Sequence, residues 1–464
     1  MFVSVFIILS QSQTDQRLEV IRNSFLHSWD GYTKCALGHD FLLPISCKSS
    51  DWMNASLTLI DSLDSLWIMG LHDQFDSAVA FLEENFSYNS FGSVFELTIR
   101  VVGGLMSAYQ LSGRKSLLDI AEKFTNKLLV SFKTDTGLPM PDVDMQNNVG
   151  KTWGWAPRTI FLSHAGSLLP ELMTLAQHSD DNNIREASDK ILNFFFENDG
   201  LDGLWPIKIN FDTGLFSNLD VSLDAYGDSF YEYFLKLFIL TDGRCKKCGE
   251  IYQKAISGIK KYLLKENDEY AFIRKIKDEK LQNQIGHLSF FIPGMIALGS
   301  QYFDKNDLNL SIKLQNTNTK WQNSTATGLM GDEFIVNDDF NITFTDSNYK
   351  LRPEFIEGCF YLYRFTGDEK WREIGWNFVQ NLIKYCETTF GYGTLINVNN
   401  PDLGIYDFQD SFLLSETFKY AYLLFSDPSV IPLNEYVFTT EAHPIKHFEK
   451  EWLDKYYSNK NGFV

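Results

Sequence analysis

The sequence predicts an all-helical toroid, in which pairs of helices stack side by side and close into a ring. Long stretches carry apolar residues at positions i, i+3, i+4 and i+7, the spacing of a buried helix face. Several stretches are apolar on almost every side, as expected of helices packed between neighbours. A short polar turn recurs between such a stretch and a more amphipathic one, which indicates repeated helix hairpins.

The apolar stretches are predicted to form the inner helices of the ring, because a helix that is apolar all round has to pack on more than one side. The amphipathic segments that follow them are predicted to be outer helices. The predicted inner helices span residues 93–111, 228–240, 286–303, 353–365 and 410–425.

The recurring turn marks the end of an inner helix. Gly113, Gly243 and Gly367 stand where a helix C-terminus favours a residue in the left-handed conformation. Two other segments, 390–398 and 434–445, are rich in β-prone residues and are predicted to be hairpins in loops. The second hairpin, near the C-terminus, is in a position to plug the ring.

The chain of 464 residues contains no long linker and no low-complexity segment, so a single domain is predicted at residues 16–450. Residues 1–15 are predicted to be a signal-like segment or the remnant of an anchor, and residues 451–464 a C-terminal tail. Residues 1–9 are apolar, but they are shorter than a bilayer span and lack the basic start of a secretory signal. Membrane anchoring by a missing N-terminal segment is therefore the alternative.

The composition favours a large core and argues against nucleic-acid binding. Hydrophobic residues make up 44% of the chain and aromatic residues 15%, so a sizeable core can form. The formal net charge is −19, whereas contact with a phosphate backbone requires clustered Lys and Arg. The acidic balance suits a neutral substrate or a bound cation, although it also serves solubility.

Sequons for N-glycosylation favour the secretory route, together with the apolar start of the chain. One sequon alone is a weak signal, but several occur. They begin at Asn54, Asn85, Asn309, Asn323 and Asn341.

Four of the six cysteines occur in two local pairs. Cys35 and Cys47 flank a short loop and could form a disulfide. Cys245 and Cys248 form a CxxC in a polar turn, which could be a disulfide, a redox pair or an incidental pair. There is no second CxxC to complete a zinc site.

Acidic residues within the apolar segments are the main functional signal, because a buried carboxylate is costly unless it is paired or functional. Glu96 precedes Arg100 by four residues, so the two share a helix face and could simply be a structural ion pair. Asp228 precedes an apolar run and could cap that helix, which would also keep it ionised. Glu354 follows a proline and falls in the first turn of a helix, where the helix dipole favours a carboxylate and hence a general base.

Further candidates accompany these acids, and each alone also has an ordinary structural explanation. Glu357 lies one turn after Glu354 on the same face. Glu416 shares a face with Phe412, which pairs an acid with an aromatic platform, as in sugar subsites. Thr440 and Glu441 precede a proline, and a Thr hydroxyl and carbonyl beside acids can hold a hard cation. His287 opens an apolar segment, where a lone histidine is more often structural than catalytic.

At these residues the sequence closely resembles glycoside hydrolase family 47, the class I α-1,2-mannosidases. The resemblance runs from about His39 to Ile445 and covers nearly the whole chain. It is carried, in order, by GHDFLLPIS, TLIDSLDSLWIMGL, VFELTIRVVGGLMSAYQLSG, GDSFYEYFLK, HLSFFIPGMIALG, LRPEFIEGCFYLYRFTGD, DSFLLSETFKYAYLLFSD and FTTEAHPI.

The resemblance implies an all-α fold, an (α/α)7 barrel with a C-terminal β-hairpin that plugs one end. It implies an inverting exo-α-1,2-mannosidase that hydrolyses terminal α-1,2-linked mannose from high-mannose N-glycans on glycoproteins and depends on calcium (Ca2+). The expected location is the lumen of the secretory pathway, in the endoplasmic reticulum or the Golgi. We expect a monomer.

The resemblance also assigns roles to the candidate residues. Glu96 matches the proposed general acid, and Asp228 matches a second catalytic acidic residue. Glu354 matches the proposed general base, and Thr440 matches the residue that binds calcium through its hydroxyl and carbonyl. The residues that match the sugar subsite or hold calcium-bound waters are Arg100, His287, Glu357, Phe412, Glu416 and Glu441.

Inversion requires a water between acid and base, so their carboxyl groups should lie about 6.5–9.5 Å apart. The acid has to stay protonated near neutral pH, so Glu96 is expected to be the more buried of the two. Some positions depart from the family pattern. Phe290 and Asn318 replace the cysteines of a common disulfide, Gly358 replaces a usual Ser, and Asp410 replaces a usual Glu.

Two alternatives remain at this stage. A weakly active or lectin-like member of the family's degradation-enhancing branch would share the fold and act in glycoprotein quality control. A helical toroid that serves only as a binding scaffold would give no reason for Glu96, Asp228, Glu354 and Thr440 to lie close together.

Overall fold

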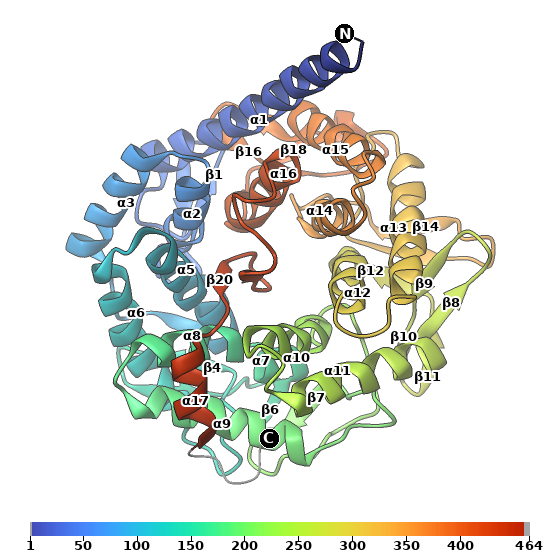
Figure 1. The fold of residues 1–464 in the computed structure, drawn as a ribbon. Coiled ribbons are helices and arrows are strands. Elements are labelled where there is room, and N and C mark those ends of the chain that lie inside the picture. Colours follow the sequence, from blue (N-terminus) through green and yellow to red (C-terminus); the bar gives the residue numbers. More distant parts are fainter. Residues whose placement is uncertain (1, 459–464) are drawn as a thin grey trace.

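The computed structural model describes residues 2–458, and their side chains from residue 13 onward. Its helices form a two-layered ring, shown in Figure 1. Along the chain an outer helix alternates with an inner one, so that seven outer and seven inner helices are arranged around the described ring. The predicted (α/α)7 barrel is confirmed.

The outer layer consists of α1 (Phe2–Cys35), α3 (His72–Asn85), α6 (Lys115–Leu128), α9 (Asn182–Glu197), α11 (Lys246–Gly258), α13 (Asp307–Asn323) and α15 (Lys370–Cys386). The inner layer consists of α2 (Leu57–Ile68), α5 (Gly103–Ser112), α8 (Leu169–His178), α10 (Asp228–Leu240), α12 (Ile292–Ser300), α14 (Glu354–Thr366) and α16 (Phe418–Phe425). Shorter α-helices are α4 (Val94–Glu96), α7 (Leu162–Gly166) and α17 (Lys450–Ser458). Turns of 3-10 or π-helix are η1 (Leu97–Val102), η2 (Leu129–Phe132), η3 (Ile259–Leu263), η4 (His287–Phe291), η5 (Pro401–Leu403) and η6 (Leu413–Thr417).

The strands are short and antiparallel. The two-stranded pairs are β1 (Phe41–Leu43) with β2 (Lys48–Ser50), β6 (Thr159–Phe161) with β7 (Lys208–Asn210), β8 (Leu264–Glu266) with β9 (Ala271–Ile273), β10 (Lys275–Lys277) with β11 (Lys280–Gln282), β15 (Glu387–Thr388) with β16 (Gly391–Tyr392), β17 (Thr394–Leu395) with β18 (Ile405–Tyr406), and β19 (Tyr436–Phe438) with β20 (Pro444–Lys446). The three-stranded sheets are β3 (Phe91–Ser93), β4 (Asp142–Asp144) and β5 (Val149–Lys151), and β12 (Gln284–Gly286), β13 (Glu333–Val336) and β14 (Ile342–Asp346).

The inner helices are apolar all round because they pack on the outer layer and on each other. Every residue of α12 is buried, and so is almost every residue of α10. Outer helices such as α6 and α9 bury one face only, which agrees with their amphipathic sequences. The core therefore runs around the ring between the two layers.

The predicted plug is confirmed, since the β19–β20 hairpin lies near the axis of the ring (Figure 1). Val437 pairs with Ile445, and the turn between the strands carries Thr440. The chain continues into α17, whose Tyr456 hydroxyl donates to Asp189 Oδ1 at 2.5 Å. The first part of the predicted tail is thus helical and held against α9.

The predicted left-handed glycines are confirmed. Gly113 and Gly367 are the C-caps of α5 and α14, with φ angles of 74° and 64°. Gly243 also has a positive φ of 73°, but it lies beyond Thr241, the C-cap of α10.

Both local cysteine pairs are disulfides in the structure. Cys35–Cys47 ties the end of α1 to the β1–β2 hairpin, and Cys245–Cys248 links the N-cap of α11 to its first turn. Cys359 and Cys386 are buried free thiols.

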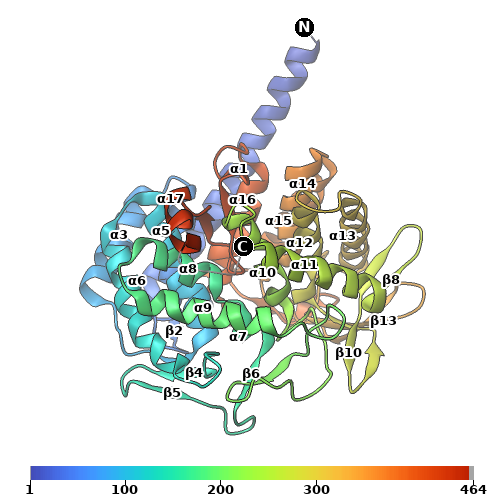
Figure 2. The same cartoon turned by 60° about the horizontal axis from the view of Figure 1, so that its bottom comes forward.

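The N-terminal end of α1 extends beyond the ring, as Figure 2 shows. No helix within residues 2–458 has the combination of length and apolar character that crossing a bilayer requires. The assignment of residues 1–15 stays a prediction, and Met1 lies outside the described residues. The boundaries of the domain at 16–450 and of the tail at 451–464 also stay predictions. Residues 459–464 lie outside the described residues.

Gly31 is required where α1 crosses the β15–β16 hairpin. A Cβ at this position would lie 1.7 Å from the carbonyl oxygen of Phe390. In an open helix Gly→Ala stabilises a protein by about 0.5–1 kcal/mol, but here the clash should dominate and Gly31→Ala should destabilise by at least about 1–3 kcal/mol. Urea denaturation measures this change, with Gly154→Ala as the control because a Cβ there meets nothing within 4 Å. A higher unfolding midpoint for Gly31→Ala would contradict the contact.

Candidate active site

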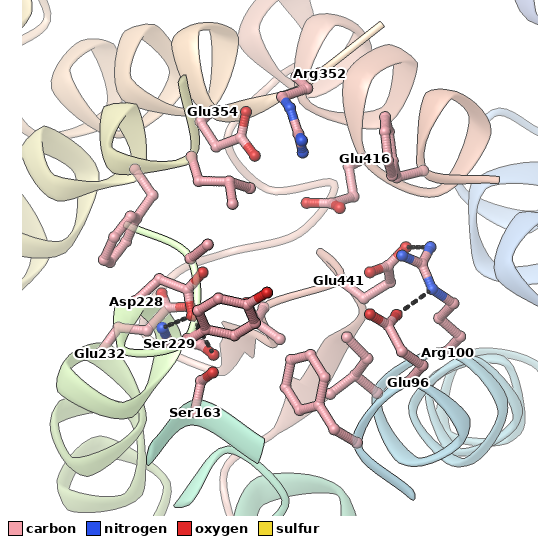
Figure 3. A pocket seen from close by; sticks show the side chains of 18 of the residues that line it. Glu96, Arg100, Ser163, Asp228, Ser229, Glu232, Arg352, Glu354, Glu416 and Glu441 are labelled. Atoms are coloured by element: carbon pink, nitrogen blue, oxygen red, sulfur yellow. Dashed lines mark hydrogen bonds and ion pairs between the residues drawn. The ribbon is translucent and has the colours of Figure 1, made fainter. Parts of the chain in front are cut away.

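A cavity of about 300 Å³ lies at the centre of the ring, and the turn of the plug hairpin forms part of its wall (Figure 3). Side chains from the inner helices and from the plug converge on it. The predicted site residues that line it are Glu96, Arg100, Asp228, Glu354, Glu357, Phe412, Glu416, Thr440 and Glu441. His287 lies behind this lining and contacts it through Glu354.

The acidic residues come from elements far apart in the sequence. Glu96 ends α4, Asp228 begins α10, and Glu354 begins α14. Glu416 lies in η6, and Glu441 lies in the turn of the plug. In Figure 3, Asp228 and Glu96 lie on opposite sides of the cavity, with the Glu354 and Glu416 side chains directed into it.

Arg100 joins several of these groups. Its Nε donates to Glu96 Oε2 at 2.8 Å, as the i, i+4 spacing predicts. Its Nη1 donates to Ser411 Oγ at 2.8 Å, pairs with Glu441 and lies 3.4 Å from Asp61 Oδ2. Glu96 is therefore both part of an ion pair and part of the cavity wall.

Two wide helical turns shape the site. Arg100 lies in η1 and Glu416 in η6, and both turns are π-helical. Such turns insert an extra residue and often occur at functional sites. A prediction based on a regular period of 3.6 residues cannot anticipate them.

Asp228 carries a proton more readily than an ordinary carboxyl. Gly227 is the N-cap of α10, so the prediction of an N-capping Asp228 is wrong by one residue. Asp228 instead opens the helix, and its Oδ1 accepts from the Ser229 N–H at 2.8 Å. Burial nevertheless raises the pKa of Asp228 to about 7, with a further contribution from the Asp224 charge.

Glu354 is held by a neighbouring histidine. His287 Nδ1 lies 2.8 Å from Glu354 Oε2, and its ring stacks on Phe290 at 4.8 Å between centroids. Phe290, at the position where the family commonly has a cysteine, thus packs against the histidine that orients the acid. The expectation that Glu96 is the more buried group is wrong, because its side chain is 20% exposed and that of Glu354 is 11% exposed.

Carboxyl groups outnumber basic groups around the cavity. Seven carboxyl groups and two guanidinium groups line it, the latter from Arg100 and Arg352. Burial raises the pKa of Glu357 and Glu416 well above the usual range, and nearby carboxylates raise it further. Burial also raises the pKa of Glu441 to about 8, against the effect of Arg100. A bound cation would relieve this repulsion.

Oxygen donors predominate in the cavity lining that includes Thr440, which suits a hard cation. In the described part of the chain, no three His, Cys, Asp or Glu side chains are grouped closely enough to hold a metal ion. Thr440 contributes a hydroxyl and a carbonyl oxygen to this part of the chain, and carboxylates line the same cavity.

Several lining residues were missed by the sequence prediction. Glu232 follows Asp228 by four residues on the same helix face, a signal that could have revealed it. Arg352, two residues before Glu354, pairs with Asp332 and lies over the Phe412 ring. Its position directly before Pro353 and Glu354 is the signal that could have revealed it.

Tyr226, which lines the cavity, belongs to an aromatic cluster with Trp153, Trp155 and Phe161. Trp153 stacks on Trp155 with centroids 5.1 Å apart, and Phe161 on Tyr226 at 3.9 Å. Tyr226 has a φ of 77°, a strained conformation for an aromatic residue. Beside it His164 lines the cavity, and burial lowers its pKa to about 4, which keeps it neutral.

Comparison with known proteins agrees with this geometry. A profile of glycosyl hydrolase family 47 matches residues 24–447. The chain belongs to this family. It is accordingly a glycoside hydrolase, as the sequence predicted.

Named relatives cover most of the chain. The human mannosyl-oligosaccharide 1,2-alpha-mannosidase IB is 36% identical over 448 residues, which are 93% of this chain and 70% of the relative. The human endoplasmic reticulum mannosyl-oligosaccharide 1,2-alpha-mannosidase is 36% identical over 438 residues, which are 91% of this chain and 62% of the relative. The chain therefore spans less than two thirds of the second relative.

Solved structures share the fold. An alpha-1,2-mannosidase from Trichoderma reesei superimposes with a TM-score of 0.87 at 25% identity, covering 93% of this chain and 99% of the other. A D-mannose isomerase, at 13% identity and a TM-score of 0.56, shares the fold alone.

The raised pKa of Asp228 has a consequence for stability. Between about pH 4 and 7 the folded protein keeps a proton on this group that the unfolded chain releases. Asp228 therefore lowers the free energy of unfolding as the pH rises, by up to about 1.4 kcal/mol per pH unit. Asp228→Asn removes this loss, so the variant should gain stability relative to the wild type from pH 4 to 7. Urea unfolding in the presence of a chelator measures the difference, and parallel pH profiles would contradict it.

Proposed function

We propose that the protein is an inverting exo-α-1,2-mannosidase that removes terminal α-1,2-linked mannose from high-mannose N-glycans on glycoproteins, with calcium as cofactor. The observation that carries the proposal is the convergence of Glu96, Asp228 and Glu354, from three separate helices, on one cavity beside Thr440. Carboxylates on opposite sides of a cavity are what glycoside hydrolysis requires. The names of the relatives supply the sugar and the linkage.

The closed shape of the cavity supports action on a terminal sugar. The plug hairpin blocks one end of the ring, so a glycan enters from the other end and only its last residue reaches the acids. Phe412 offers a ring face at the cavity wall, with the Arg100 and Arg352 guanidinium carbons each 5.9 Å from its centroid. Two rings of the aromatic cluster, Trp155 and Tyr226, are exposed and present further ring faces for a sugar.

Glu354 is proposed to be the general base. Its place at the N-terminus of α14 favours the carboxylate, which can take a proton from a water that attacks the anomeric carbon. The contact with His287 fixes the orientation of the carboxylate toward that water. Inversion follows if this water and the leaving oxygen lie on opposite faces of the sugar.

Asp228 is proposed to be the proton donor. Its raised pKa leaves a large fraction protonated near neutral pH, as an acid catalyst requires. Glu96, the other candidate acid, is engaged with the Arg100 guanidinium, which favours a carboxylate. Glu96 is then suited to hold the Arg100 side chain and the sugar in place.

Calcium is proposed to bind at Thr440. The hydroxyl and carbonyl of Thr440 would be direct ligands, and Glu357, Glu416 and Glu441 would hold water molecules of the ion. When bound, the ion would fix sugar hydroxyls and add positive charge to a site rich in carboxylates. The chain's own part is to present these oxygens in a fixed arrangement.

The proposed setting is the lumen of the endoplasmic reticulum or the Golgi. The name of one relative specifies the endoplasmic reticulum. The asparagines of all five sequons are exposed, which is compatible with passage through that lumen; they are Asn54, Asn85, Asn309, Asn323 and Asn341. A monomer and an N-terminal anchor remain proposals of the same kind.

A weakly active or lectin-like role is the second candidate. Phe290, in place of the family's common cysteine, favours it because the degradation-enhancing branch lacks that cysteine as well. Release of mannose from a defined high-mannose glycan by the wild-type protein separates the two candidates. Tight glycan binding without release would favour the lectin.

Glu354→Gln should abolish turnover while the protein still folds and binds glycan. Loss of a positioned general base lowers kcat by about 100- to 10,000-fold, whereas the amide keeps the shape of the side chain. Mannose release from a high-mannose glycan measures kcat. Glu84→Gln is the matched control, because Glu84 is exposed on the outer helix α3 and should leave kcat unchanged. Near-normal turnover in Glu354→Gln would reject the base.

Thr440→Val should weaken calcium binding by at least about 10-fold, because one of the proposed ligand oxygens is lost while the side chain keeps its shape. Isothermal titration calorimetry of the chelator-treated protein measures the affinity. Thr345→Val, an exposed position on β14, is the control. Equal calcium affinity in wild type and Thr440→Val would reject the ion site, and full activity in excess chelator would reject the cofactor.

A further inference from the structure

The turn of the plug hairpin, residues 439–443, is held in a strained shape. The Thr439 N–H donates to the His443 carbonyl at 3.0 Å, and the Ala442 N–H donates to the Thr439 carbonyl at 3.1 Å. Ala442 has a φ of 55°, in the left-handed region that an alanine avoids. Such a conformation costs about 1–3 kcal/mol, so the surroundings have to maintain it.

A buried ion pair between Lys419 and Asp64 holds the C-terminal end of this turn. Lys419 of α16 donates from Nζ to the Ala442 carbonyl at 2.7 Å. The same ammonium lies 2.8 Å from Asp64 Oδ1 of α2, and both side chains have no exposed surface. The other oxygen of Asp64 lies 2.8 Å from His443 Nδ1. Two consecutive residues of the turn are thus bound to one carboxylate–ammonium pair.

A second pair of buried residues, Tyr233 and Glu171, holds the turn at Thr440. The Thr440 N–H donates to the Tyr233 hydroxyl oxygen at 3.0 Å. The Tyr233 hydroxyl in turn donates to Glu171 Oε1 at 2.5 Å. The backbone of Thr440 is therefore fixed on one side by α10 and α8, and on the other by α2 and α16.

Tight packing leaves the turn little room to shift. A Cβ at Gly103 would lie 3.0 Å from the His443 ring, and one at Gly104 would lie 3.3 Å from it. The backbone of α5 therefore lies directly against the histidine. The Ser107 hydroxyl, on the same helix, lies 2.9 Å from both Asp64 Oδ2 and the Pro444 carbonyl oxygen and is shared between them.

An ion pair of this kind is a poor source of stability. Desolvating two charges costs several kcal/mol per ion, and apolar side chains of the same size often serve as well or better. The pair instead fixes the position of the turn, because the ammonium holds the carbonyl of Ala442, two residues beyond Thr440. Lys419 does not line the cavity, so it can act on the site only through the turn.

We propose that Lys419, paired with Asp64, is a positioning residue that holds the plug turn so that the Thr440 hydroxyl and carbonyl are already arranged for a divalent cation. The inference rests on the calcium site of the proposed function. Without the pair, Ala442 can relax to an unstrained φ, and the Thr440 oxygens would have to be reordered whenever the ion binds. The cost of that reordering should appear as weaker calcium binding.

The test compares calcium binding by the full chain with and without the pair. Asp64→Asn/Lys419→Met removes both charges at once, so that neither is left buried alone. Calcium titration calorimetry should show at least about 10-fold weaker binding, and the rise of Tm on adding calcium should shrink accordingly. Asp307→Asn/Lys260→Met is the matched control, because this ion pair joins η3 to the outer helix α13, and calcium binding should not change.

A second double variant separates positioning from stability. Asp64→Asn/Lys419→Gln also removes the charges but keeps an N–H donor for the Ala442 carbonyl. If Lys419 acts by position, calcium affinity should recover part of the loss seen with Met. A merely structural role predicts lower Tm values without calcium and equal affinities in all variants. If the Met variant does not fold, the Gln variant is compared with the wild type, and it should bind calcium more weakly.

The outcomes distinguish this inference from the proposed function. A wild-type protein that binds no calcium would overturn the ion site itself, and the inference with it. A wild type that binds calcium, together with double variants that bind it equally well, would overturn the positioning role alone.

Discussion

The ion pairing of Arg100 with carboxylates from three parts of the chain is the constraint on which the centre of the ring depends. Acids that are taken out of water repel each other and lose hydration, so they can be gathered there only with compensating charge. Arg100 provides it for Glu96, Glu441 and Asp61, which come from α4, the plug turn and α2. Glu441 belongs to the plug turn. The same guanidinium that stabilises the cavity wall therefore also holds the plug turn against it.

The charges continue from there into the base of the ring. His443 lies between Asp61 and Asp64, at 3.4 Å and 2.8 Å from their oxygens, so the network that begins at Glu96 reaches Lys419. Partners in such a network are worth more together than pairwise counts suggest, because each orients the next. The plug turn therefore does more than close one end of the ring. Its backbone is set by the same electrostatics that set the acids above it.

The fold could be read from the sequence because hydrophobic periodicity decides it. The predicted inner helix at 228–240 coincides with α10, since every turn of that helix is buried. The acids were found for a related reason: a Glu or Asp within an apolar run is conspicuous. The π-helical turns that carry Arg100 and Glu416 were not predictable, because one inserted residue leaves no local signature. The partners of Asp64 were hidden too, since Lys419 meets it only when distant helices close the ring.

The arrangement of the acids also bears on the binding-scaffold alternative. A toroid that only presents a surface would gain nothing from gathering seven carboxyl groups around one cavity, and would pay for their desolvation. In this protein the buried carboxyl groups are kept despite their mutual repulsion, and their different surroundings give them different properties. Asp228 has a pKa raised to about 7, whereas Glu354 lies at a helix N-terminus against His287. Two carboxyl groups with such different surroundings are suited to give and to take a proton in one reaction, which a scaffold does not require.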